Sequence, residues 1–180
     1  MLTYHDEQRL RTARLELIAC GIERLQRLQQ GPEAYRSAYQ TGVIEGYLDF
    51  PQALEFSITR MQGESASAWW APFVFVLEAE QAVVGLGGYK GPPDGAGVVE
   101  IGYSIAPTHQ GQGFATEAAH AMVLHALRRT GVLAVRAHTL PERNASARVL
   151  EKNGFRKVAE TIDPDDGVVW RWERERGAGH

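Results

Sequence analysis

The chain has few of the features that mark secreted, membrane-spanning or nucleic-acid-binding proteins. Its 180 residues include a single cysteine, Cys20, so no internal disulfide can form and no oxidising compartment is implied. The longest apolar runs, such as residues 73–77, are far shorter than the ~20 residues that span a bilayer. Nineteen basic residues against 22 acidic ones give a net charge of −3, which argues against binding to nucleic-acid phosphates.

The composition that remains is that of a folded protein, with 44% hydrophobic and 23% charged residues. At about 150 residues per domain, the length allows one domain. The first residues lack a basic segment followed by an apolar core, so no signal peptide is expected. We therefore expect a cytoplasmic protein with an N-terminal extension over 1–10, a single domain over 11–174 and a flexible tail over 175–180.

Hydrophobic patterning predicts an α+β domain, with strands and helices alternating along the chain. Helices are expected to begin near Ile22, Pro32 and Pro51 and to cover 113–129 and 145–153. The remaining apolar segments predict a mixed sheet packed against these helices. Its expected strands are 12–19, 73–77, 82–89, 98–105, 132–140, 156–161 and 168–174.

The most informative segment is residues 100–117, in which a strand ends at Pro107, passes through a loop and enters a helix. Unpaired backbone N–H groups and the positive end of a helix dipole gather at such a point and bind phosphate. Gly111 and Gly113 would let the backbone approach a bulky pyrophosphate without Cβ atoms in the way. Strand–loop–helix turns also favour glycine for structural reasons alone, and that alternative stays open.

Two named phosphate-binding motifs do not fit this loop. A Walker A sequence needs Lys followed by Ser or Thr after its last glycine, where Phe114 and Ala115 stand. A dinucleotide-binding fingerprint lacks its final glycine or alanine, because Thr116 occupies that place, and it lacks the acidic residue about 20 positions further on. An unrelated ATP- or NAD-binding domain is thus disfavoured.

The pattern Gln110-x-x-Gly113-x-Ala115 resembles the coenzyme A signature of the GNAT acetyltransferases. Residues 12–17, 100–107 and 146–155 are similar, in the right order, to further blocks of the RimJ/RimL-type branch. The resemblance covers most of residues 12–172, with residues 20–70 the least specific. It implies a GNAT-type mixed, V-shaped central β-sheet flanked by helices, and an N-acetyltransferase that uses acetyl-CoA and no metal.

The resemblance also implies which residues hold acetyl-CoA. Backbone groups after the central strand would pair with the pantetheine amides as an added strand does, and the loop N–H groups would hold the pyrophosphate. Arg143 stands where the branch carries an asparagine, so the neighbouring Asn144 either takes that role or only caps the helix. The expected cofactor-binding residues are Ser104, Ile105, Ala106, His109, Gln110, Gly111, Gln112, Gly113, Phe114, Ala115, Thr116 and Asn144.

Acetyl transfer requires a neutral amine and a group that accepts its proton. Glu100 is the candidate base, directly or through water, with an ion-paired surface residue as the alternative. Ser146 is the candidate contact for the thiol, with helix capping as the alternative. Tyr103 and His138 are candidates for contact with the acceptor, and side-chain packing is the alternative for both.

These residues predict an enzyme that transfers acetyl from acetyl-CoA to a primary amine, of a protein N-terminus or a small molecule, by direct attack in a ternary complex. The alternative is a catalytically silent acyl-CoA-binding module on the same fold. The family resemblance and the aromatic residues near the C-terminus, Trp170 and Trp172, favour a homodimer. No nucleic-acid partner, membrane or metal is expected; His120 and His125, five apart on one helix, have the wrong spacing for a metal pair.

Overall fold

The computed structural model describes residues 8–47, 51–62 and 68–177. Within them lie nine strands and five α-helices, and the chain divides by its internal contacts into two compact units. The first unit comprises the described residues of Met1–Gly88 and Tyr103–Ala118; the second comprises Tyr89–Gly102 and the described residues of Ala119–His180. Each unit is described by itself below.

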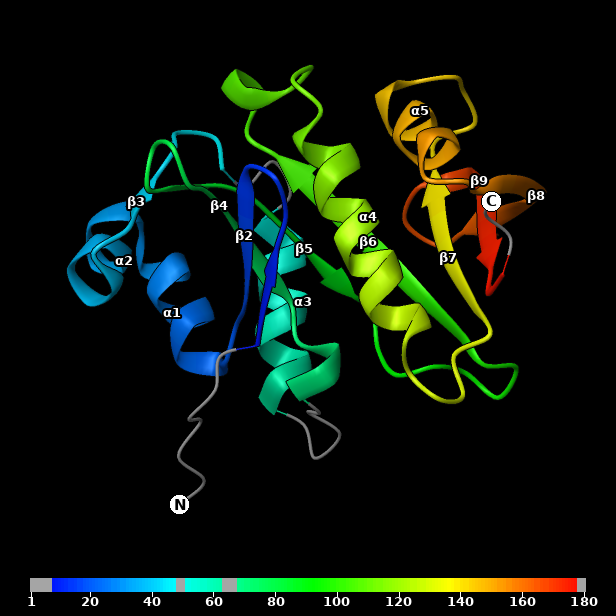
Figure 1. Cartoon of the computed structure of the whole chain (residues 1–180), viewed down its shortest axis with the longest axis horizontal. Coiled ribbons are helices and arrows are strands. Elements are labelled where there is room, and N and C mark those ends of the chain that lie inside the picture. Colours follow the sequence, from blue (N-terminus) through cyan, green and yellow to red (C-terminus); the bar gives the residue numbers. More distant parts are fainter. Residues whose placement is uncertain (1–7, 48–50, 63–67, 178–180) are drawn as a thin grey trace. The chain divides into compact units, whose positions relative to one another are not determined.

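The strands of the first unit form antiparallel pairs in the order β1, β2, β4 and β5, and the short β3 pairs in parallel with β5 (Figure 1). Every residue of β4 is buried, because this strand, rich in valine and phenylalanine, lies between two neighbours. The predicted hairpin of β4 and β5 is confirmed to the residue. The bounds are β1 (Arg9–Arg11), β2 (Leu15–Ala19), β3 (Gly42–Val43), β4 (Phe73–Leu77) and β5 (Ala82–Tyr89).

The beginning of the chain differs from the prediction in one respect. Arg9 lies in β1, opposite Ile18 of β2, so the segment expected to be an extension over residues 1–10 includes part of a strand. The first strand expected over 12–19 begins only at Leu15, because Thr12 forms a turn that closes on the Leu15 carbonyl. The strand β3 was not predicted, since it has only two residues and so short a strand shows no alternation of apolar and polar residues.

The helices predicted to begin at Ile22, Pro32 and Pro51 are confirmed. They are α1 (Ile22–Gln30), α2 (Pro32–Tyr39) and α3 (Pro51–Gln62), and α1 packs against both of the others. The predicted apolar side of α3 is buried, through Leu54, Ile58 and Met61. Cys20 is fully buried, as expected of a core residue. Residues 63–67, whose glycine and serines predict a loop, lie outside the described residues.

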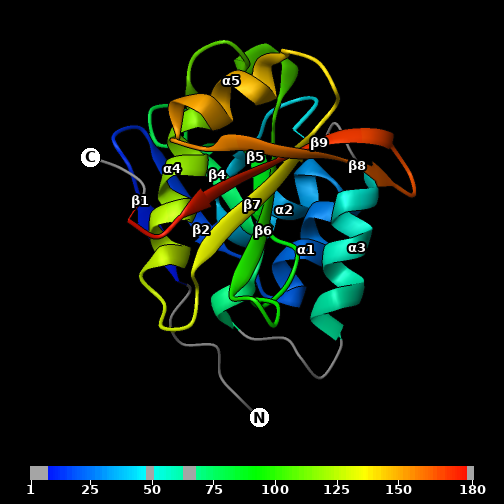
Figure 2. The ribbon, with the colours of Figure 1, turned by 90° about the vertical axis from the view of Figure 1, so that its right-hand side faces the viewer.

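The second unit combines parallel and antiparallel pairing, which confirms the predicted mixed sheet of an α+β fold. Here β6 pairs in parallel with β7, which pairs antiparallel with β9, and β9 pairs antiparallel with β8 (Figure 2). Helix α5 packs against β7, as both views show (Figures 1 and 2). The bounds are β6 (Val98–Ile105), α4 (Phe114–Leu127), β7 (Ala134–Thr139), α5 (Ala145–Lys152), β8 (Arg156–Asp163) and β9 (Gly167–Glu175). Both β6 and α4 run from one unit into the other.

The core of the second unit includes a tryptophan of β9 and one side of α4. Trp172 is only 3% exposed, and its indole N–H donates to the Thr139 hydroxyl at 3.0 Å, so this side chain packs inside the unit. In the sequence, Phe114, Ala118, Ala121, Met122 and His125 predict one apolar side of this helix. Ala121 is only half-buried, whereas Ala119 and Val123 are fully buried. The predicted strand at 132–140 is shorter at both ends, and both strands of the last hairpin are longer.

β9 continues to Glu175, the first residue of the expected tail, and residues 178–180 lie outside the described part. Among the described residues, no helix is both long enough and apolar enough to cross a membrane.

Candidate functional site

The loop between β6 and α4 has the backbone geometry that the phosphate-binding prediction requires. Gly111 and Gly113 have φ angles of 74° and 86°, in the left-handed region where a side chain is strained. The two glycines turn the chain into α4, whose first N–H groups have no intrahelical acceptor. From Gly111 to Ala115, the backbone N–H groups find no acceptor anywhere in the described ranges. They form a row of donors at the positive end of the helix dipole.

The part of the loop before Gly111 is held by internal hydrogen bonds. The Gln110 side-chain amide donates to the Ile105 carbonyl at 2.9 Å, which ties the loop back to the end of β6. The backbone N–H of His109 donates to the Ala106 carbonyl at 2.8 Å, and that of Gln110 to the Pro107 carbonyl at 3.4 Å. The pyrophosphate donors expected from His109 onward therefore narrow to the groups from Gly111 to Ala115.

The residues expected to meet pantetheine differ in what they can offer. The Ala106 N–H donates to the Val84 carbonyl at 2.8 Å, and the Ala106 carbonyl accepts the His109 N–H. Both backbone groups of Ala106 therefore already have a hydrogen-bond partner. The Ser104 carbonyl lies close against Gly85: a Cβ at that glycine would stand 2.4 Å from the oxygen. This close approach explains why a glycine interrupts β5. The Ile105 carbonyl also has a partner, the Gln110 side-chain amide, so a role of Ser104 and Ile105 in holding pantetheine stays a prediction.

Arg14 and Thr12 anchor the start of α4, a contact that sequence reasoning missed. The Glu117 carboxylate accepts from the Thr12 hydroxyl at 2.5 Å, from the Arg14 backbone N–H at 2.7 Å and from Arg14 Nε at 2.8 Å. Arg14 also donates to the Gln112 carbonyl at 3.0 Å, and its guanidinium lies 4.4 Å from the centre of the Phe114 ring. Burial raises the pKa of Glu117, but the hydrogen bonds from Thr12 and Arg14 and the charge of Arg14 outweigh it and hold the pKa below its ordinary value. In the sequence, the motif Thr12-x-Arg14 predicts only the start of a strand and does not indicate this contact.

The loop suits the cofactor that the sequence implied. A pyrophosphate carries two anionic groups, and the row of N–H donors with glycines at 111 and 113 offers hydrogen bonds without Cβ atoms in the way. At Gly111 an added Cβ would meet nothing within 4 Å, whereas at Gly113 it would meet Arg14 at 3.3 Å. The residues present therefore fit coenzyme A.

His109 and Thr116, the other loop candidates with side-chain donors, are placed differently. The His109 ring lies between the Thr108 hydroxyl, 2.9 Å from Nδ1, and the Glu80 carboxylate, 3.1 Å from Nε2. The contact with Glu80 fixes the ring against the turn between β4 and β5. Thr116 lies in the first turn of α4, and a cofactor role for it stays a prediction.

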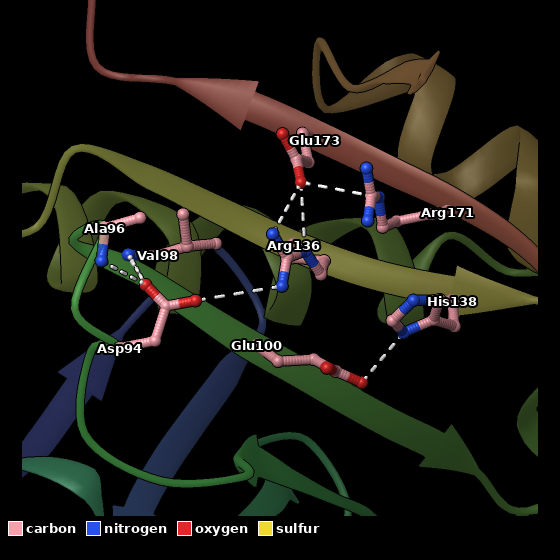
Figure 3. A network of polar contacts seen from close by, with 8 residues as sticks. All are labelled: Asp94, Ala96, Val98, Glu100, Arg136, His138, Arg171 and Glu173. Carbon is pink, nitrogen blue, oxygen red and sulfur yellow. Dashed lines mark hydrogen bonds and ion pairs between the residues drawn. The ribbon is translucent and has the colours of Figure 1, made fainter. Parts of the chain in front are cut away.

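In the second unit, Glu100 on β6 faces His138 on β7 across the parallel pair (Figure 3). His138 Nδ1 lies 2.9 Å from Glu100 Oε1, and Lys90 Nζ lies 2.5 Å from the same oxygen. Burial raises the pKa of Glu100, but the hydrogen bonds and charges of Lys90 and His138 outweigh it, so the pKa lies below its ordinary value. Glu100 is thus ion-paired with Lys90, as the alternative for this residue predicts, and it also contacts His138.

The rest of this face is an ion-pair network around Arg136 (Figure 3). Arg136 contacts Glu173 of β9 at 2.8 Å and Asp94 at 3.8 Å, and Arg171 lies 3.6 Å from the same Glu173 oxygen. Asp94 also accepts backbone N–H groups within the predicted loop at 91–97, at 2.9 and 3.0 Å. The two arginines of this face are therefore engaged with carboxylates other than Glu100.

The start of α5 separates the two roles that the sequence left open. Asn144 is the N-cap: its side-chain oxygen accepts the Ala147 N–H at 2.9 Å. Ser146 is the second residue of α5 and half-buried, and its hydroxyl has no hydrogen bond to any described residue. Capping therefore belongs to Asn144, and Ser146 is available for a ligand. Arg143, at the family's asparagine position, pairs with Glu151 at 3.4 Å on the surface.

Of the remaining candidates, His120 lies 3.2 Å from the Asn153 side-chain oxygen and His125 is buried beside Tyr89, in line with structural roles. Across the described residues there is no group of three or more side chains of the kinds that ligate metals. Tyr103 is half-buried, and a contact with the acceptor stays a prediction.

Comparison with known proteins agrees with this geometry. Residues 22–156 match the model of the acetyltransferase (GNAT) domain. An N-acetyltransferase of Bacillus subtilis (strain 168), YjdG, is 28% identical over 148 residues, which are 81% of this chain and 88% of that protein. Two solved structures share the fold. RimL, a ribosomal L7/L12 alpha-N-protein acetyltransferase in complex with coenzyme A, has a TM-score of 0.70 and 19% identity, with coverage of 96% of this chain and 100% of RimL.

The second structure is the GNAT-family acetyltransferase from Bacillus anthracis, with a TM-score of 0.64 and 18% identity over 94% of this chain and 99% of that one. The fold that the sequence resemblance implied is therefore confirmed. The relatives are acetyltransferases, and no comparison favours the catalytically silent alternative. The chain belongs to the GNAT acetyltransferase family and uses acetyl-CoA as its acetyl donor.

Proposed function

We propose that this enzyme transfers acetyl to a primary amine, of a protein N-terminus or a small molecule, by direct attack within a ternary complex. The observation that carries the proposal is the row of N–H donors from Gly111 to Ala115 at the start of α4, in a chain of this family. Bound acetyl-CoA supplies an activated thioester, and the chain's own groups bind it and manage the proton of the amine.

Several of the predicted site residues can then be given a task. The loop donors hold the pyrophosphate, and the backbone of Ser104 and Ile105 meets the pantetheine amides. The Ser146 hydroxyl, without a partner in the described chain, meets the thiol. The pair of Glu100 and His138 receives the proton that the amine loses.

The acceptor must be a neutral amine when it attacks. An α-amine has a pKa of about 7.7–8.0 and is partly neutral at physiological pH, whereas a lysine-type amine, with a pKa of about 10.4, needs more help from a base. RimL is described as an α-N-protein acetyltransferase, which supports a protein N-terminus as the first acceptor class to test here.

The experiment is a screen for thiol release from acetyl-CoA over peptides, amino acids, polyamines and aminoglycosides. We expect release with at least one class of primary amine and with none of the corresponding N-acetylated compounds. Initial rates with both substrates varied should then give intersecting reciprocal plots, since both substrates bind before any product leaves. Parallel plots would contradict direct attack, and coenzyme A binding without turnover on any amine would favour the silent module.

A further inference from the structure

His138 and Glu100 form a pair on the half-buried polar face of the second unit (Figure 3). Their side chains are 21% and 22% exposed, so the pair is accessible to a ligand but partly shielded from water. An ionised carboxylate can only accept hydrogen bonds, so the 2.9 Å contact places a proton on His138 Nδ1. In the neutral ring the lone pair is then on Nε2.

The second ring nitrogen has no hydrogen-bond partner among the described residues, since the one hydrogen bond of the His138 ring there is to Glu100. A ring held through Nδ1 by a carboxylate, with its Nε2 lone pair available, is the arrangement of a general base with an orienting partner. The same two residues were predicted separately, Glu100 as the base and His138 as an acceptor contact, because the sequence does not show that they touch.

Glu100 itself is poorly placed to accept a proton at neutral pH. Lys90 and His138 both contact its Oε1, and their hydrogen bonds and charges hold its pKa below the ordinary value despite the burial that raises it. A carboxylate stabilised in this way binds a proton weakly. Imidazole, by contrast, ordinarily changes charge near neutral pH, where a general base is most effective.

We propose that His138 Nε2 is the atom that accepts the proton of the attacking amine, and that Glu100 is a positioning residue that fixes the ring. The assignment rests on the amine acetylation proposed above. As the amine nitrogen forms its bond to the acetyl carbon, the carbon–sulfur bond breaks and the coenzyme A thiolate leaves. The nitrogen's proton passes to Nε2, and solvent protonates the thiolate and later takes the proton from the ring.

The charged groups around the ring are consistent with this role. Glu100 faces it from β6 and Lys90 from the segment after β5, while Arg171 is its cross-strand neighbour on β9 and is turned to Glu173. From β8, Asp163 is close enough for His138 to contribute to lowering its pKa, although backbone N–H groups contribute most. On β7 itself, Arg136 is paired with Glu173. The ring thus interacts with two carboxylates, Glu100 directly and Asp163 at longer range, while Arg136 and Arg171 are paired with Glu173.

The kinetic test compares His138→Gln and Glu100→Gln with His120→Gln, which removes an imidazole elsewhere in the same unit. With a primary amine accepted by the parent enzyme, His138→Gln should lower kcat about 100-fold at neutral pH and leave the KM for acetyl-CoA nearly unchanged. It should also remove the acidic limb of the pH–rate profile. Glu100→Gln should lower kcat less, because the imidazole is still present but loses the carboxylate that orients its ring. His120→Gln should behave as the parent.

A His138→Gln enzyme that matches the His120→Gln control, beside a Glu100→Gln enzyme without activity, would overturn the assignment and make Glu100 the base. A second readout needs no turnover. Nitrogen-15 NMR of the ring in the free protein should show Nδ1 protonated and Nε2 unprotonated in the parent, and a loss of that preference in Glu100→Gln. A parent ring protonated at Nε2 would overturn the proposal. A parent that acetylates no amine would instead contradict the proposed function, whatever the NMR shows.

Discussion

The guanidinium of Arg14 and the carboxylate of Glu117 form a two-point contact, with both Nε and the terminal nitrogen 2.8 Å from Oε2. The contact joins the turn before β2 to the first turn of α4, more than a hundred residues later in the chain. Arg14 also donates to the Gln112 carbonyl. It therefore holds both the loop that carries the N–H donors and the helix that follows this loop. The cofactor loop is thus held in place before any ligand arrives.

Replacing Arg14 should therefore weaken cofactor binding without changing the chemistry. We expect Arg14→Gln to raise the dissociation constant for coenzyme A about tenfold, the equivalent of one lost charge-assisted contact. Binding of acetyl-pantetheine, which has no pyrophosphate, should not change. Calorimetry with coenzyme A and with acetyl-pantetheine measures the two dissociation constants. Arg11→Gln is the matched control, because the Arg11 side chain is 75% exposed. Equal losses for both ligands would show that Arg14 does not act through the loop.

Glu117 should contribute stability that depends on pH. Its pKa is lowered in the folded protein, so the folded state favours the ionised form. The contribution is present above the unfolded pKa, about 4.3, and is lost as pH falls through the lower folded value. Glu117→Gln should cost about 1.5–3 kcal/mol of unfolding free energy at pH 7, and the gap to the parent should narrow with acidification. Urea unfolding at pH 7 and pH 3.5 tests this; a gap that widens in acid would contradict it.

At the start of α5, Asn144 caps the helix and Ser146 is a candidate for contact with the thiol; a cofactor role for Asn144 stays a prediction. Asn144→Ala removes the cap and should lower the unfolding free energy by about 1 kcal/mol. Ser146→Ala removes a hydroxyl without a partner in the described chain and should leave stability unchanged while lowering kcat. Thermal unfolding and steady-state rates on both variants measure the two effects. If Ser146→Ala lost stability and kept full activity, the proposed thiol contact would be excluded.

The homodimer predicted from the family resemblance stays a prediction. One of its two tryptophans, Trp172, packs within its own unit and offers nothing to a partner. We still expect twice the chain mass in light scattering at micromolar concentration. A measured mass of 19.9 kDa would show a monomer.

Most of the regular structure could be predicted, because it follows from patterns a few residues long. The β4–β5 hairpin, β6 and the helices that begin at Pro32 and Pro51 follow from alternation, helical spacing and proline. β1 could not be predicted, since its sequence of Arg, Leu and Arg is too short and too polar to indicate a strand. It is a strand because β2 offers an unpaired edge.

In the candidate site, too, the features that could be predicted are those formed by residues close together in the sequence. The donor loop could be predicted, since its glycines and the helix that follows are adjacent in sequence. The contacts of Arg14 with Glu117 and of Glu100 with His138 could not, because each joins residues far apart in the chain. The sequence also does not show which N–H groups of the loop donate to other loop or strand carbonyls. In the folded protein these are the N–H groups of Ala106, His109 and Gln110.

The most direct test of this account is calorimetry of coenzyme A binding to Gly113→Val, because the proposed function depends on the donor row. Valine at a φ of 86° is strained, and its Cβ would stand 3.3 Å from the Arg14 guanidinium, so the donors can no longer converge. Gly21→Val is the control, since a Cβ there meets nothing within 4 Å and the backbone is extended. We predict that Gly113→Val loses detectable binding with an unchanged circular dichroism spectrum, while Gly21→Val binds as the parent does. A Gly113→Val protein that binds coenzyme A with the parent's affinity would contradict the account.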